Sequence, residues 1–136
     1  MSKAKSFIFK GKQSFSSSKL EQIKRQFIKL NNLDTEIYSN EIYFIQVESE
    51  FTDIESIKDV LSASNQDEQF SFYVGPRLGT ISPWSSKTED IVRNVGLDMV
   101  IRVERLFGFT ITCEFNLKEI DASMFYDRMT QSIYST

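Results

Sequence analysis

The sequence predicts a mixed α+β fold made of two halves with the same order of elements. Short runs rich in β-branched and aromatic residues alternate with stretches in which apolar side chains recur every three to four residues. The content of 40% hydrophobic and 26% charged residues is typical of a globular chain. The expected order β-α-β-β-α occurs twice, over about residues 5–66 and 69–136. We therefore expect one domain whose duplicated halves pack pseudo-symmetrically.

The first half begins with an expected strand at Ser6–Lys10. The first helix has the spacing of a capping box, Ser18 followed by Glu21, and it is expected to end at Asn31-Asn32. Its apolar stripe is Leu20, Ile23, Phe27 and Leu30. The runs Thr35–Tyr38 and Glu41–Val47 flank Ser39-Asn40, and this pattern predicts a hairpin.

The second helix of this half is expected to start at Thr52, which has Glu55 three positions later. Its apolar stripe is Ile54, Ile57, Val60 and Leu61. The polar stretch Ser62–Glu68 is expected to be a loop.

In the second half, a strand is expected at Phe70–Val74 and a helix from Ser86, which has Glu89 three positions later. Gly96 stands where a glycine usually ends a helix. The β-rich runs Met99–Val103 and Phe109–Glu114 lie on either side of Gly108. A last helix is expected from Asp121, with Met124, Phe125, Met129 and Ile133 on its apolar side. Cys113 alternates with apolar residues and is expected in the core.

The composition excludes several classes of function. Sixteen Lys and Arg against nineteen Asp and Glu give a net charge of −3, which disfavours general nucleic-acid binding. The chain has no histidine, so a Ser-His-Asp triad, a Cys-His dyad and the usual zinc sites are excluded. One cysteine allows no internal disulfide, and no apolar run is long enough for a membrane span. A cytoplasmic location without a membrane partner is expected.

The stretch of residues 75–90, GPRLGTISPWSSKTED, holds both prolines and the only tryptophan. One interpretation is structural: Pro76 and Pro83 fix φ, Gly75 and Gly79 permit positive φ, and Ser86 caps the helix. Trp84 would then cover the edge of the core. The other interpretation is a phosphate or anion site, because Arg77, Ser82, Ser85, Ser86 and Lys87 gather around a helix N-terminus.

The same stretch carries a resemblance. The run PRLGTISPWSSKTEDIVRNVGL, followed by VIRVERLFGF, resembles the N-terminal domain of large single-chain phosphoribosylformylglycinamidine synthases. The positions that agree are Pro76, Arg77, Gly79, Thr80, Ile81, Ser82, Pro83, Trp84, Ser85, Ser86, Lys87, Asp90, Ile91, Arg102, Glu104 and Arg105. The closing YDRMTQSIY also resembles the last segment of that domain.

The resemblance implies a piece of a larger ligase and glutamine amidotransferase of purine biosynthesis. Its N-terminal domain is similar to a fused pair of the small S subunits of the split enzyme. The catalytic parts, which use ATP, magnesium and glutamine, are the synthetase and glutaminase domains, so no catalytic, cofactor-binding or metal residue is expected in residues 1–136. The implied role is that of a scaffold that contacts the linker, synthetase and glutaminase domains. An exposed docking face would also favour self-association of the isolated piece.

The candidate interface residues are Arg77, Thr80, Ser82, Trp84, Ser85, Lys87, Arg102, Glu104 and Arg105. Tryptophan and arginine are frequent interface anchors, and rigid prolines reduce the entropy lost on docking. Two alternatives stay open at this point. Arg102 and Glu104 share one face of a strand and could form only a surface ion pair. The chain could also be a stand-alone module that binds an anion with the 75–90 loop and the helix start.

Overall fold

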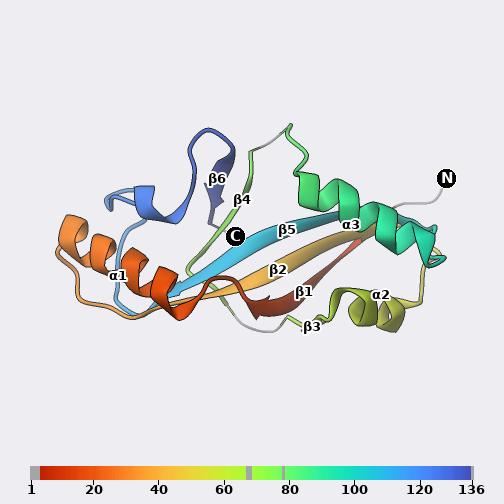
Figure 1. The fold of residues 1–136 in the computed structure, drawn as a ribbon, viewed down its shortest axis with the longest axis horizontal. Coiled ribbons are helices and arrows are strands. Elements are labelled where there is room, and N and C mark those ends of the chain that lie inside the picture. The colour runs from red at the N-terminus through yellow and green to blue at the C-terminus, as the bar shows by residue number, and fades with distance from the viewer. Residues whose placement is uncertain (1–3, 67–68, 78, 136) are drawn as a thin grey trace.

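The computed structural model describes residues 4–66, 69–77 and 79–135, and it confirms a mixed α+β fold (Figure 1). The helices in these residues are α1 (Ser17–Asn31), α2 (Ile54–Leu61), α3 (Pro83–Asn94) and the 3₁₀ turn η1 (Ser123–Phe125). The strands are β1 (Lys5–Gln13), β2 (Ile37–Val47), β3 (Ser64–Asn65), β4 (Phe72–Pro76), β5 (Val100–Ile111) and β6 (Gln131–Tyr134). No helix in the described ranges is long and apolar enough to cross a membrane.

The strands form one antiparallel sheet in the order β3-β1-β2-β5-β4-β6. β2 and β5 are its long central pair and stay in register from Ile37 opposite Ile111 to Gln46 opposite Arg102. β1 flanks β2 on the other side along most of its length. Both sides of β2 are therefore hydrogen-bonded along most of its length.

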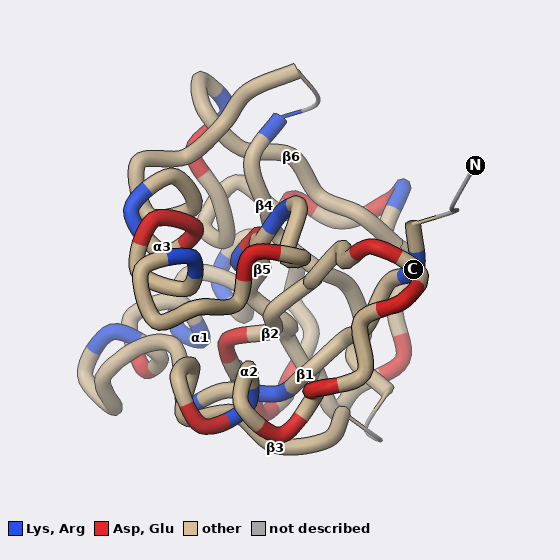
Figure 2. Tube along the Cα trace, turned by 90° about the vertical axis from the view of Figure 1, so that its right-hand side faces the viewer, with Lys and Arg blue, Asp and Glu red and all other residues tan. Residues whose placement is uncertain are grey.

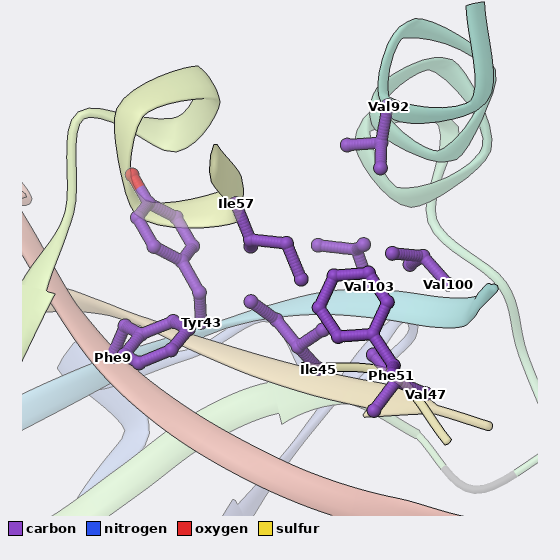
Figure 3. Packing of buried hydrophobic residues seen from close by; sticks show 9 residues of the cluster. All are labelled: Phe9, Tyr43, Ile45, Val47, Phe51, Ile57, Val92, Val100 and Val103. Atoms are coloured by element: carbon purple, nitrogen blue, oxygen red, sulfur yellow. The ribbon is translucent and has the colours of Figure 1, made fainter. Parts of the chain in front are cut away.

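The helices cover one face of the sheet. Odd-numbered residues of β2 point to this face and contribute to two apolar clusters. The first cluster lies beneath α2 and α3, where Ile57 and Val92 face Ile45 and Val103 (Figure 3). The second lies beneath α1 and η1, around Phe27, Phe72, Phe109 and Phe125. The clusters fix the helices along the sheet, and among the described residues the opposite face carries no helix.

The helix-free face carries the even-numbered residues of β2 and their partners on β5. Phe44 lies opposite Glu104, and Ile42 opposite Leu106. Phe70, just before β4, also lies here, because a Cβ on Gly108 would come within 2.8 Å of its ring. Gly108 is therefore an interior strand glycine that makes room for an aromatic ring. This face is covered only in part.

Two predicted strand breaks were wrong. The hairpin around Ser39-Asn40 is absent, because β2 runs through these residues without a turn. Asn40 pairs with Gln13 on one side and Gly108 on the other, so ladders on both sides hold a turn-type residue in extended conformation. Met99–Val103 and Phe109–Glu114 are likewise not separate strands, because β5 is continuous through Gly108.

The predicted last helix from Asp121 was also wrong. The chain forms only η1, and Gln131–Tyr134 is strand β6, which pairs with Tyr73–Pro76 of β4. The apolar spacing that suggested a helix is satisfied instead by Phe125 in the second core cluster and by Ile133 packed against it. The predicted polar loop after Leu61 contains the short strand β3, and its Asp67 and Glu68 lie outside the described residues.

The helix ends were predicted better than the helix starts. Asn32 has a left-handed φ of 55° at the end of α1, and Gly96 has a φ of 97° just after α3, as expected. The N-caps are Ser16, Asp53 and Ser82 in place of the predicted Ser18, Thr52 and Ser86. Each observed cap accepts a hydrogen bond from the main-chain N–H three residues later.

The predicted order β-α-β-β-α is not observed in either half. The described elements run β1-α1-β2-α2-β3 and then β4-α3-β5-η1-β6. Each half contributes three strands to the sheet, and the halves meet at the β2–β5 pair. Pseudo-symmetric packing of two duplicated halves stays a prediction.

Candidate docking groove

The outer edge of β5 pairs with β4 only in part, and side chains of α3 bond to the remainder of this edge. β4 pairs with β5 only from Phe72 to Val74 and continues beside β6 (Figure 1). Beyond that point, Ser85 of α3 donates a hydrogen bond to the carbonyl of Val103, and the Glu89 carboxylate accepts from the Val103 N–H at 3.1 Å. Arg93 donates to the carbonyl of Ile101 at 3.0 Å. Ser85, Glu89 and Arg93, which lie about one helical turn apart on α3, thus bond to main-chain groups of β5 that a neighbouring strand would otherwise pair with.

Ser82 holds the start of α3 through two side-chain hydrogen bonds. Its hydroxyl accepts from the Ser85 N–H at 3.0 Å and donates to the Glu104 carboxylate at 3.3 Å. Pro83 follows as the first helical residue, where its missing N–H costs nothing. The N–H of Ser86 bonds to the Ser82 carbonyl as an ordinary helical residue. Ser86 is therefore not the cap.

Glu104 is a buried carboxylate on the helix-free face, with 5% of its surface exposed. One oxygen accepts from Ser82 and from the main-chain N–H of Arg105 at 3.1 Å. The other pairs with Arg102 at 3.3 Å. The predicted Arg102–Glu104 ion pair is thus present, but its acidic partner is buried. These bonds tie the start of α3 to the sheet.

A groove of about 370 Å³ opens where β4 separates from β5. Its lining residues are Phe44, Pro76, Arg77, Gly79, Arg102, Glu104, Leu106 and Tyr134. A second hollow of about 400 Å³ shares Gly79 and Arg102 with it and is also lined by Gln46, Thr80, Ile81, Glu89 and Ile101. The two together are called the groove below. It combines an apolar floor with charged groups.

Hydrogen bonds hold Thr80 close to Arg77 at the groove. The N–H and hydroxyl of Thr80 both donate to the Arg77 carbonyl, at 3.0 and 2.6 Å. Gly79 has a φ of 84°, which glycine adopts without strain. Gly75 was expected to permit a positive φ as well, but positive φ values among the glycines occur at Gly79 and Gly96. A Cβ on Gly75 would come within 2.1 Å of Leu106, so this glycine makes room for the groove floor.

Trp84 and Arg105 point to the opposite, helix-covered face. The Trp84 ring stacks on Tyr43, with 5.6 Å between ring centroids. The Arg105 guanidinium lies 4.9 Å from the Trp84 ring and pairs with the buried Glu41 at 3.1 Å. The Tyr43 hydroxyl donates to Glu41, and burial together with this negative charge raises the Tyr43 pKa to about 12. Trp84 therefore covers the core, as the structural interpretation expected.

The structure divides the nine candidate residues into groups. Arg77, Thr80, Arg102 and Glu104 line the groove, and Ser82 lies beneath it. Trp84, Ser85 and Arg105 are internal supports. Lys87 is exposed on α3 and is absent from the groove lining.

Sequence reasoning missed Phe44, Leu106 and Tyr134, which form much of the groove floor and wall. The alternation of Phe44 and Leu106 along their strands is a signal in the sequence. The predicted breaks in both strands hid the fact that the two residues lie on the same face of the paired strands. Cys113 is only partly buried and packs against the second cluster.

Charge is dispersed over the molecule. Figure 2 shows basic and acidic positions interspersed along the trace. In the groove, Glu104 is the single carboxylate of the first hollow, and both of its oxygens already accept hydrogen bonds. The described residues of this first hollow do not fit a magnesium site, which requires available oxygen ligands.

The sequence comparison identifies the family of the chain. A family model described as formylglycinamide ribonucleotide amidotransferase N-terminal matches residues 40–136, well over half of the chain. The match begins within β2 and includes every residue that lines the groove. Strand β1 precedes the match but pairs with β2 in the same sheet. The chain therefore belongs to the formylglycinamide ribonucleotide amidotransferase N-terminal domain family.

Proposed function

We propose that this chain is a non-catalytic assembly domain of a purine-biosynthesis formylglycinamide ribonucleotide amidotransferase. In this role it holds the synthetase and glutaminase parts in register in the cytoplasm, together with the linker that joins them. Family membership supports an N-terminal position in a larger enzyme. The scaffold role itself rests on the groove.

The observation that carries the proposal is an open groove beside the hydrogen-bonded start of α3. The hydrogen bonds from Thr80 to the Arg77 carbonyl, the Ser82 cap and Pro83 restrain residues 79–83. Trp84, at the end of the loop, is anchored internally on Tyr43. A preorganised loop loses little conformational entropy when a partner docks. This supports a surface built for binding another part of the enzyme.

The chemistry of the groove does not favour catalysis. The chain has no histidine, and the groove's buried carboxylate is fully engaged by Ser82, Arg102 and the Arg105 N–H. A general acid or base needs a proton-transfer position that is not already bonded. That ATP and magnesium bind in other parts of the enzyme stays a prediction.

The stand-alone anion module is less well supported. At the start of α3, Pro83 lacks an N–H and the Ser85 N–H bonds to Ser82. The Glu104 carboxylate already lies at this helix terminus through Ser82, where it offers the negative charge that the dipole favours. A bound anion at this position would be repelled by that carboxylate.

Complementation tests the proposal. An enzyme of this family lacking its N-terminal domain would be mixed with this chain, and glutamine-dependent amidine formation would be measured. Restored activity is the expected result, with bovine serum albumin as the control for unspecific protection. If the enzyme part binds the chain but its activity stays unchanged, the assembly role is wrong. Tight binding of inorganic phosphate by the chain alone would favour the anion module instead.

A further inference from the structure

We infer that the groove binds an extended segment from the rest of the enzyme that presents one carboxylate beside apolar side chains. This inference rests on the proposed function, and it names the chemistry of the partner and the residues that recognise it. Its basis is the charge, the apolar floor and the length of the groove.

The charges of the first hollow are unbalanced. Within the described residues, Arg77 has no carboxylate partner, and its guanidinium only donates a long hydrogen bond of 3.5 Å to the Arg128 carbonyl. Arg102 pairs with Glu104, but 48% of its side chain is exposed. In the first hollow, two guanidinium groups thus face one buried carboxylate, whereas Glu89 in the second hollow is already bonded to Ser85, the Val103 N–H and Arg93. One additional carboxylate would neutralise the site, and guanidinium groups suit such an acceptor because of their forked donors.

The floor of the groove is apolar. Phe44 and Leu106 lie on the helix-free face, and both stay partly exposed beneath the rim. Pro76 and Tyr134 form the wall on the β4–β6 side, where the Tyr134 hydroxyl is already bonded to the Pro76 carbonyl at 2.5 Å. An apolar side chain of the partner would cover this floor, and the removal of water would strengthen the ion pair above it.

The length of the groove favours a segment over a small anion. The second hollow continues the first past Gly79 and Arg102. At that end Ile81 is 70% exposed and Ile101 is 43% exposed. A free phosphate or carboxylate would contact the arginines and leave these isoleucines in water. An extended segment would cover them and the arginines together.

The test uses this chain and an enzyme of the family that lacks its N-terminal domain, with binding measured by calorimetry. The charge reversals Arg77→Glu and Lys87→Glu are compared, because both residues are exposed and only Arg77 lies in the groove. We expect Arg77→Glu to weaken binding by roughly tenfold or more, and Lys87→Glu by less than about twofold. A photoreactive benzoylphenylalanine at Phe44 should cross-link to a segment that contains Asp or Glu beside apolar residues.

The outcomes separate the two proposals. The inference is wrong, but the assembly role is not, if the wild-type chain binds and both charge reversals weaken binding equally. The same holds if the cross-linked segment contains no acidic residue. Absence of wild-type binding overturns both. If Arg77→Glu converts a dimer of this chain to a monomer in sedimentation, the occupant is a second copy and the inference is wrong. It is also wrong if inorganic phosphate alone binds at Arg77.

Discussion

Arg105→Met tests whether this arginine of the sequence motif stabilises the fold through buried contacts. The Arg105 guanidinium contacts three groups on the helix-covered face: the Glu41 carboxylate at 3.1 Å, the Trp84 ring at 4.9 Å and the Phe107 ring at 5.1 Å. Only 6% of the Glu41 side chain is exposed. Methionine keeps an apolar chain at this position but leaves the Glu41 charge without its cationic partner.

The expected loss of unfolding free energy is about 3 kcal/mol. Removing one member of a fully buried ion pair costs about 3–5 kcal/mol, and the lower end applies because Arg105 is 31% exposed. The two ring contacts contribute about 0.5–1 kcal/mol each, part of which methionine retains. For a domain of this size, this loss corresponds to a decrease in Tm of about 10 °C.

Urea unfolding followed by tryptophan fluorescence measures this loss directly, because Trp84 is the only tryptophan and lies in the cluster. Arg77→Met is the matched control, since the same exchange at a residue without a carboxylate partner should change stability by less than about 0.5 kcal/mol. Adding Glu41→Gln to Arg105→Met should recover about 1–2 kcal/mol, because the buried charge is removed. The reasoning is refuted if Arg105→Met behaves like the control, or if the second change recovers nothing.

Three further predictions concern stability. Gly108→Ala should lower the free energy of unfolding by about 1–3 kcal/mol because the added Cβ meets the Phe70 ring. This loss should largely disappear in a Phe70→Ala background. Equal losses in both backgrounds would contradict the contact. The pKa of Tyr43 is raised to about 12 from an ordinary value near 10, so between these pH values the folded state retains a proton that the unfolded state loses. The free energy of unfolding should therefore decrease between pH 10 and 12, by at most about 1.4 kcal/mol per pH unit. Urea unfolding at pH 9, 10 and 11 should show this decrease, and Tyr43→Phe should make it smaller; an identical slope in the variant would contradict the assignment. Ser85→Ala should cost about 1–2 kcal/mol in a thermal melt because it removes a buried bond to β5, whereas the exposed neighbour Ser86→Ala should change little.

The part of the candidate site that could be predicted from the sequence is its one contiguous stretch. The stretch from Arg77 to Lys87 contains turn, cap and anchor residues in an order that predicts a rigid loop before a helix. It was not predictable which of these residues face a groove. Ser82 and Ser85 are the same amino acid three positions apart, but Ser82 caps α3 beneath the groove and Ser85 bonds to the buried edge of β5. The position of α3 against β5 decides this difference.

By itself, the sequence determined the amphipathic helices, the ends of α1 and α3, the mixed fold class and the family. These features depend on local spacing, on residues such as Asn32 and Gly96 that adopt left-handed backbone, and on a contiguous motif. Only the tertiary structure decided that Asn40 and Gly108 lie within long strands and that Gln131–Tyr134 is a strand. The reason is that hydrogen bonds from distant neighbouring strands outweigh local turn and helix preferences. The same long-range pairing separates β4 from β5 and thereby creates the groove.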